Sequence, residues 1–167
     1  MEKIDVQSEA ASTRELSTRA LQIRALQADD FQRWKGLFAG YCDFYQLPAD
    51  EQKINTMWGW LNDPLNMLEG VVACDETGQI VGLAHFHGWP QSLLGTEVCY
   101  LSDLYVDPES RVGGVGKTLY RYMLALCKQR GWSALTLLTH KENRVARGLY
   151  DQFGEASGFR FYETPVD

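Results

Sequence analysis

A glycine-rich segment has the residue types and spacing with the clearest chemical use. Gly113, Gly114 and Gly116 precede a segment whose apolar residues recur at helical spacing. The first N–H groups of a helix lack intrahelical partners and lie at the positive end of its dipole. Glycines let such a backbone approach an anion, so the spacing predicts a phosphate-binding loop. A tight turn alone would also explain the glycines, but their density before a helix favours an anion site.

Two kinds of phosphate site resemble this loop. The segment 113–118 reads GGVGKT, close to the nucleotide-binding pattern G-x-x-x-x-G-K-[ST]. The first glycine of that pattern would fall where the chain has Arg111. A nucleotide hydrolase also needs further strands and an acidic metal ligand, and too little chain follows Thr118 to supply them. ATP binding is therefore the weaker hypothesis.

The second pattern extends over much of the chain. The matching segments, in order, are YLSDLYVDPE at 100–109, RVGGVG at 111–116, NRVARGLY at 143–150 and GF at 158–159. They resemble the central strand, the R/Q-x-x-G-x-G/A loop, the N-x-x-A-x-x-L-Y helix and the closing Gly-Phe of the GCN5-related N-acetyltransferase (GNAT) family, small-amine acetyltransferases in particular. The resemblance covers roughly residues 21–162. It implies direct attack of a primary amine on acetyl-CoA, the cosubstrate.

The resemblance also implies which residues bind acetyl-CoA. The central strand would pair with the pantetheine arm through its backbone, and the glycine-rich loop would hold the pyrophosphate. The implied cofactor-binding residues are Leu104, Tyr105, Val106, Arg111, Val112, Gly113, Gly114, Val115, Gly116, Lys117, Asn143 and Tyr150. No metal is expected, because no cysteine or carboxylate at ligand spacing accompanies His85 and His87.

Catalysis needs a proton donor for the departing thiolate and a deprotonated amine. Tyr150 matches the family's general acid, and a phenol with a reference pKa of about 10 is protonated at neutral pH. Some relatives, especially polyamine acetyltransferases, carry a glutamate on the central strand where this chain has Ser102. We expect Asp103 to be the carboxylate of the acceptor site, with Glu97 as the alternative. Either would act through a water, unless the amine arrives neutral.

Aromatic residues are concentrated between positions 41 and 60. Most of them are expected in the core, but in the family the first two helices line the acceptor pocket, and aromatic faces attract cationic amines. The predicted acceptor-binding residues are Tyr41, Tyr45, Glu97 and Asp103. The predicted acceptor is a small amine or an amino-acid-like molecule. A protein lysine or N-terminus is the alternative acceptor, and a non-catalytic acyl-CoA-binding module is an alternative of another class.

Hydrophobic periodicity predicts the elements that position these residues. The predicted strands are 21–26, 70–75, 79–86, 97–106, 133–139 and 159–163, and the predicted helices are 31–45, 48–62, 114–130 and 142–153. A loop is expected at 88–96. The order β-α-α-β-β-β-α-β-α-β predicts an α/β fold with a mixed sheet that contains a parallel βαβ crossover. The resemblance implies that this sheet is GNAT-like, which means mainly antiparallel and flanked by helices.

Bulk properties limit the class of protein. The 167 residues, 45% of them hydrophobic, suit one domain at 20–167 after a mobile tail at 1–19. A net charge of −6 argues against nucleic-acid binding. No apolar run reaches the ~20 residues of a membrane span, and the start lacks a signal-peptide core. A cytoplasmic enzyme without a membrane partner is expected, and the family resemblance suggests a homodimer.

Overall fold

The computed structural model describes residues 21–110 and 112–166, so the tail predicted at 1–19 lies outside the described residues. The chain divides into two compact units, one up to Leu137 and one from Leu138 onward. The elements in chain order are β1 (Gln22–Ala25), the 3-10 turn η1 (Ala28–Asp30), α1 (Phe31–Phe44), α2 (Glu51–Asn62), β2 (Glu69–Cys74), β3 (Ile80–Gln91), β4 (Thr96–Val106), α3 (Val115–Arg130), β5 (Leu135–Leu137) and α4 (Arg144–Tyr150).

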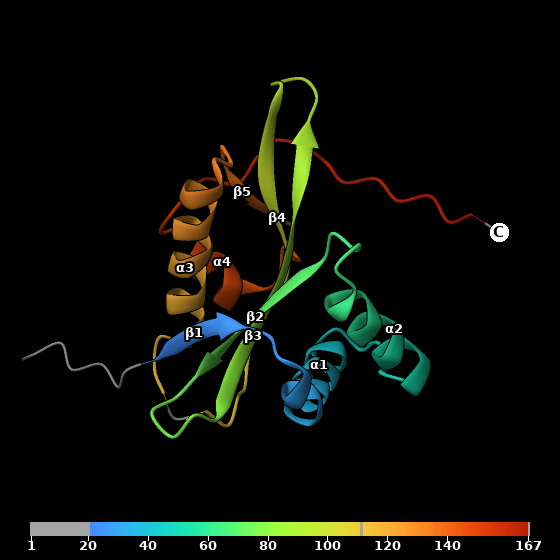
Figure 1. Cartoon of the computed structure of the whole chain (residues 1–167). Coiled ribbons are helices and arrows are strands. Elements are labelled where there is room, and N and C mark those ends of the chain that lie inside the picture. The colour runs from blue at the N-terminus through green and yellow to red at the C-terminus, as the bar shows by residue number, and fades with distance from the viewer. Residues whose placement is uncertain (1–20, 111, 167) are drawn as a thin grey trace, which may run out of the picture. The chain divides into compact units, whose positions relative to one another are not determined.

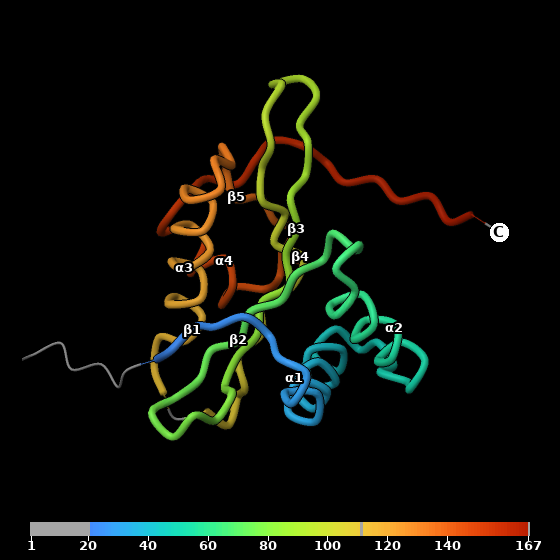
Figure 2. The backbone as a smooth tube through the Cα atoms, viewed as in Figure 1, coloured from blue at the N-terminus to red at the C-terminus, as the bar shows by residue number. Residues whose placement is uncertain are grey.

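The first unit is built on a five-stranded sheet in the order β1-β2-β3-β4-β5. Neighbouring strands are antiparallel as far as β4, and β4 pairs with β5 in parallel. The parallel pair requires a crossover, which α3 provides. The mixed, mainly antiparallel sheet predicted from the sequence is therefore confirmed (Figures 1 and 2).

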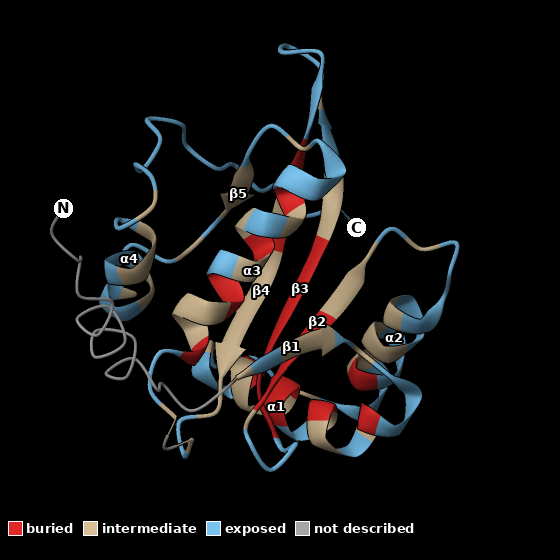
Figure 3. Ribbon diagram, turned by 60° about the vertical axis from the view of Figure 1, so that its left-hand side comes forward, coloured by how far each residue is buried: buried red, intermediate tan, exposed pale blue. Residues whose placement is uncertain are grey.

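Helices cover both faces of this sheet, α1 and α2 on one side and α3 on the other (Figures 1 and 3). On the first face Trp34 and Phe38 of α1 and Ile54 of α2 pack with Leu83 of β3 in one buried cluster. Gly82, the preceding residue, faces α3. A Cβ there would lie 3.0 Å from Val115 and 3.1 Å from the Tyr105 carbonyl oxygen, so glycine permits the close approach of α3.

The sequence-based prediction of a loop at 88–96 is wrong. β3 and β4 continue through most of this segment and leave only a short turn, as the long hairpin in Figure 2 shows. Pro90 pairs with Glu97 near the end of β3, where a residue without an N–H is tolerated. Trp89 meets Tyr100 edge-on at 5.1 Å, and this contact extends the ladder. Cross-strand packing therefore outweighs the turn-forming residues.

The closing strand predicted at 159–163 is also wrong. In the second unit α4 is the one regular element among the described residues, and the segment after it is irregular. Phe159 is 93% exposed. A strand needs a neighbouring edge for its backbone hydrogen bonds, and periodicity alone cannot supply that edge.

Candidate active site

β4 is longer than its neighbour β5, and this leaves a stretch of backbone beyond the parallel ladder. β5 pairs with β4 only from Cys99 to Leu101. On the other side β3 pairs with β4 as far as Val106, and the Asp107 N–H donates to the Val81 carbonyl at 2.9 Å. Antiparallel ladders alternate, so the backbone groups of Leu104 and Val106 point away from β3. The backbone N–H and C=O groups of Tyr105 point toward β3.

One extra residue in β4 changes which side chains share a face. His85 pairs with Asp103 and Phe86 pairs with Leu101, so Ser102 lies in a bulge without a partner on β3. Bulges re-aim side chains and are frequent beside active sites. Asp103 therefore lies on the same face as Tyr100, whose partner on β3 is His87. A regular strand would place residues three apart on opposite faces.

Asp103 is held by a buried chain of hydrogen bonds. The Nδ1 atom of His85 lies 2.8 Å from a carboxylate oxygen of Asp103, and the Trp34 Nε1–H donates to His85 Nε2 at 2.9 Å. An indole can only donate, so Nε2 accepts and the proton of the neutral ring is on Nδ1, where it donates to Asp103. The His85 side chain is 1% exposed and that of Asp103 18%. The core thus orients a carboxylate that solvent still reaches.

Sequence reasoning missed the roles of Trp34 and His85. Trp34 falls in the helix predicted at 31–45 and His85 in the strand predicted at 79–86, and neither pattern gives the side chain a partner. The alternation of β3 places His85 on a core-facing side, which is a usable signal for a satisfied buried histidine. Its partners are far away in the chain, however, so only the packing of α1 on the sheet identifies them.

One predicted acceptor-binding tyrosine, Tyr41, lies beside Asp103, and a second, Tyr45, packs against Tyr41. Burial, the negative charge of Asp103 and a hydrogen bond to it raise the pKa of Tyr41, so the phenol stays protonated. The Tyr45 ring meets the Tyr41 ring edge-on at 5.2 Å. Glu97 is exposed and pairs with Pro90, six residues along β4 from Asp103. The structure therefore brings Tyr41, Tyr45 and Asp103 together and leaves Glu97 apart.

The glycine-rich loop ends in the first turn of α3. Gly114 is the N-cap residue with φ of 79°, a left-handed conformation that favours glycine, and no described side chain caps the helix. A Cβ on Gly113 would meet no described atom within 4 Å. The Val115 side chain is buried. Arg111 lies outside the described residues. Val112, Gly116 and Lys117 complete this helix start, whose geometry suits an anion.

The second unit holds the remaining predicted site residues. Asn143 is the N-cap of α4, and its side-chain oxygen accepts from the Ala146 N–H at 3.2 Å. The N-cap hydrogen bond stabilises the helix, and this is by itself a sufficient reason for an asparagine at position 143. Tyr150 is the last residue of α4 and is half-buried.

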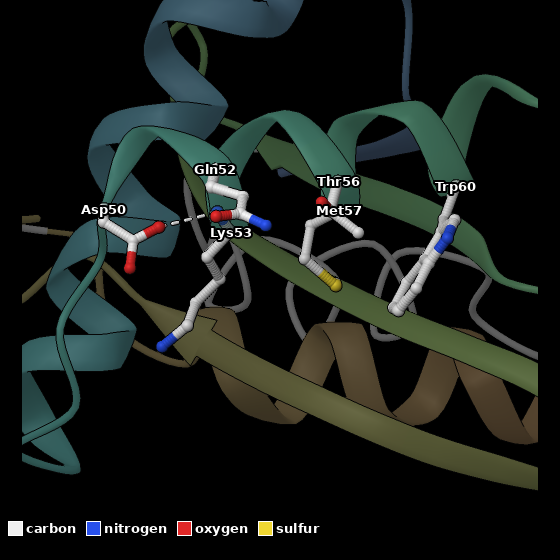
Figure 4. A pocket seen from close by; sticks show the side chains of 6 residues that line it. All are labelled: Asp50, Gln52, Lys53, Thr56, Met57 and Trp60. Carbon is white, nitrogen blue, oxygen red and sulfur yellow. Dashed lines mark hydrogen bonds between the residues drawn. The ribbon is translucent and has the colours of Figure 1, made fainter.

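Two hollows are present in the described surface of the first unit. One, of about 300 Å³, follows α2 and its N-cap, where Asp50 accepts from the Lys53 N–H (Figure 4). Its lining residues are Asp50, Gln52, Lys53, Thr56, Met57 and Trp60. The other, of about 370 Å³, lies on the β3–β4 hairpin and is lined by Met67, His87, Gly88, Trp89, Pro90 and Tyr100.

The residues at 21–110 and 112–166 contain neither a metal-binding cluster nor a membrane-spanning helix. Within them, no group of three or more His, Cys, Asp or Glu side chains is arranged to hold a metal ion. None of the helices that the structure describes has the length and apolar character that crossing a bilayer would need.

Comparison with known proteins identifies the family. Residues 24–154 match the model of the acetyltransferase (GNAT) family. The chain is 32% identical over 122 residues to the D-amino-acid N-acetyltransferase HPA3 of Saccharomyces cerevisiae, covering 72% of this chain and 76% of that protein. It is 33% identical over 129 residues to the uncharacterized N-acetyltransferase YhfO of Bacillus subtilis, covering 75% and 85%.

A solved structure shares the fold. The ribosomal-protein-alanine N-acetyltransferase from Brucella melitensis biovar Abortus 2308 has a TM-score of 0.73 and 24% identity, over 89% of this chain and all of that one. The family model and the two relatives agree on the family. The chain belongs to the acetyltransferase (GNAT) family and is an acetyl-CoA-dependent N-acetyltransferase.

Proposed function

We propose that this enzyme acetylates the primary amine of a small or amino-acid-like molecule. The observation that carries the proposal is the cluster of Asp103, Tyr41 and Tyr45 directly beside the bulge in β4. A carboxylate attracts an ammonium group by charge, and phenol rings add cation–π attraction. Similarity to a D-amino-acid N-acetyltransferase supports an amino-acid-like acceptor.

The first unit has two features that fit acetyl-CoA. The outward backbone groups of Leu104 and Val106 can pair with the amides of the pantetheine arm, as in strand addition. The helix start at Gly114 suits the pyrophosphate. The residues that we assign to acetyl-CoA, with Arg111, Asn143 and Tyr150 assigned from the family resemblance, are Leu104, Tyr105, Val106, Arg111, Val112, Gly113, Gly114, Val115, Gly116, Lys117, Asn143 and Tyr150. When bound, acetyl-CoA supplies an activated thioester carbonyl.

Two residues of this chain have proposed catalytic roles. Asp103 binds the incoming ammonium group and is the carboxylate through which its proton leaves, since only a neutral amine can attack a carbonyl. Tyr150 donates its phenolic proton to the departing thiolate. Tyr41 stays protonated because its pKa is raised, so it orients Asp103 and does not compete as a base.

The test is an acceptor panel with free-thiol release as the signal. It contains propylamine, 2-phenylethylamine, spermidine, D- and L-amino acids, and peptides that offer a lysine or an N-terminal alanine. We expect kcat/KM for the small amines or amino acids to exceed that for the peptides by at least about tenfold. A tenfold ratio corresponds to a difference of about 1.4 kcal/mol. Preference for a peptide would replace the proposal with protein acetylation.

Cosubstrate binding is tested separately from turnover. Acetyl-CoA is expected to raise the melting temperature by mass action, and ATP is expected to leave it unchanged. A rise with ATP alone would contradict the assignment of the loop. We also propose a cytoplasmic homodimer, to be tested by light scattering and cell fractionation.

A further inference from the structure

We infer that the β3–β4 hairpin supplies a second recognition pocket, which binds an aromatic or large apolar group attached to the acceptor amine. This inference rests on the proposed function, because it takes Asp103 as the residue that binds the amine. The pocket is the hollow of about 370 Å³ that Trp89, Tyr100 and His87 line together with Met67. Its volume is in the range of small-molecule sites.

The pocket and Asp103 lie on the same face of the sheet. His85 pairs with Asp103, and the next pair on that face is His87 with Tyr100, because the bulge at Ser102 takes up one residue. Two residues along a strand span about 7 Å. Burial and, after it, the charge of Asp103 raise the pKa of Tyr100, in agreement with this proximity. A chain of a few atoms can therefore join the amine to the group in the pocket.

The walls of the pocket select for apolar groups. The Tyr100 ring lies 5.3 Å from the His87 ring and 5.1 Å from the Trp89 ring, between centroids. Trp89 and Met67 are exposed, so a ligand ring would cover apolar surface that water now contacts. The flexible thioether side chain of Met67 can also adapt to ligand rings of different shapes.

One polar atom in the pocket lining lacks a partner. The Nδ1 atom of His87 is buried and makes no hydrogen bond to any described residue. Burial lowers the pKa of His87, so the ring is neutral at neutral pH and offers no charge to a carboxylate. The pocket therefore combines aromatic walls with an uncharged histidine.

The decisive variant is Trp89→Ala, with Leu93→Ala as its control. Leu93 is exposed in the same hairpin and does not line the pocket. For the unmodified enzyme we expect the KM for 2-phenylethylamine to be about tenfold below that for propylamine. Trp89→Ala should remove most of this difference by raising the KM for 2-phenylethylamine alone. Leu93→Ala should change neither constant, and both variants should keep their unfolding midpoints.

A binding measurement separates failure of the pocket from failure of the proposed function. Titration of 2-phenylethylamine by calorimetry, without turnover, should give a Kd that Trp89→Ala raises about tenfold. Equal KM values for the two amines, or an equal effect of Trp89→Ala on both, would overturn the pocket while leaving amine acetylation intact. Binding that depends on Trp89 without acetylation of any amine would support the pocket and contradict the proposed function.

Discussion

His85 joins the hydrophobic core to Asp103, the carboxylate that we propose for the acceptor site. Its Nδ1 atom lies 2.8 Å from Asp103, and its Nε2 atom lies 2.9 Å from the indole nitrogen of Trp34, which is fully buried. The donor-only indole sets the tautomer of the imidazole and therefore the direction of its N–H toward Asp103. The orientation of this carboxylate thus depends on how α1 packs against β3.

Trp34→Phe tests this link, because it removes the indole N–H while keeping a ring in the core. We expect the free energy of unfolding to fall by about 2 kcal/mol, from a lost hydrogen bond and a small cavity. The Asp103 carboxylate still accepts from Nδ1–H in the variant, so the nitrogen chemical shifts of His85 should show the same tautomer in both proteins. Trp58→Phe is the control, since Trp58 packs against Trp34 at 4.9 Å but does not hold His85. An equal loss of unfolding free energy in the two variants would contradict the contribution of the hydrogen bond between Trp34 and His85.

Asp103→Asn should weaken amine binding while retaining the shape of the side chain and an oxygen that accepts from His85. Hydrogen bonds to charged groups contribute about 1.5–3 kcal/mol, so the KM of the amine should rise roughly 10- to 100-fold at pH 7. The Kd for acetyl-CoA should stay constant. Glu76→Gln is the control, because it removes one negative charge in the exposed turn between β2 and β3. A fall in kcat at constant KM would show that Asp103 only accepts a proton.

Tyr150→Phe removes the proposed proton donor. General acid catalysis contributes about 10²- to 10⁴-fold, so kcat should fall by at least about 10²-fold. The affinity for acetyl-CoA, measured by calorimetry, should change little. Tyr162→Phe provides the control, because Tyr162 is exposed in the irregular segment after α4. Full activity in Tyr150→Phe would exclude this residue as the acid.

A buried ion pair makes stability depend on pH. Arg24 donates to both carboxylate oxygens of Asp30, at 2.6 and 2.8 Å. These bonds, with one from the Gln27 N–H, hold the pKa of Asp30 below its usual range. A lowered folded-state pKa means that the pair stabilises the protein above the unfolded value, about 4, and that this contribution is lost as the pH falls through the folded value.

Asp30→Asn should therefore lower the free energy of unfolding at pH 7 by about 3 kcal/mol, because it leaves a partly buried guanidinium without its partner. The variant and the unmodified protein should converge in denaturant titrations only as the pH falls below the lowered folded-state pKa of Asp30. Glu51→Gln is the control, since its pair with Lys35 is exposed and should contribute less than about 1 kcal/mol. A difference that stays constant with pH would contradict the role of the ion pair.

The sequence by itself determined the local features of this enzyme. Helical spacing of apolar residues placed α1, α2 and α3 close to their observed ends, and alternation placed most strands of the sheet. The glycines at 113–116 predicted a helix start open to an anion. Each of these signals depends on residues a few positions apart, where backbone preference and one-sided burial act directly. Resemblance to the GNAT family added the activity.

Only the tertiary structure decided how residues far apart in the chain meet. The bulge at Ser102 decides which side chains of β4 lie on the same face of the sheet as Asp103. A shift of one residue in the strand moves every side chain beyond it to the opposite face. The early end of β5 leaves Leu104 and Val106 with outward backbone groups. The partners of His85 come from α1 and β4. These relationships depend on strand register and helix packing, which are set by nonlocal contacts that no periodicity encodes.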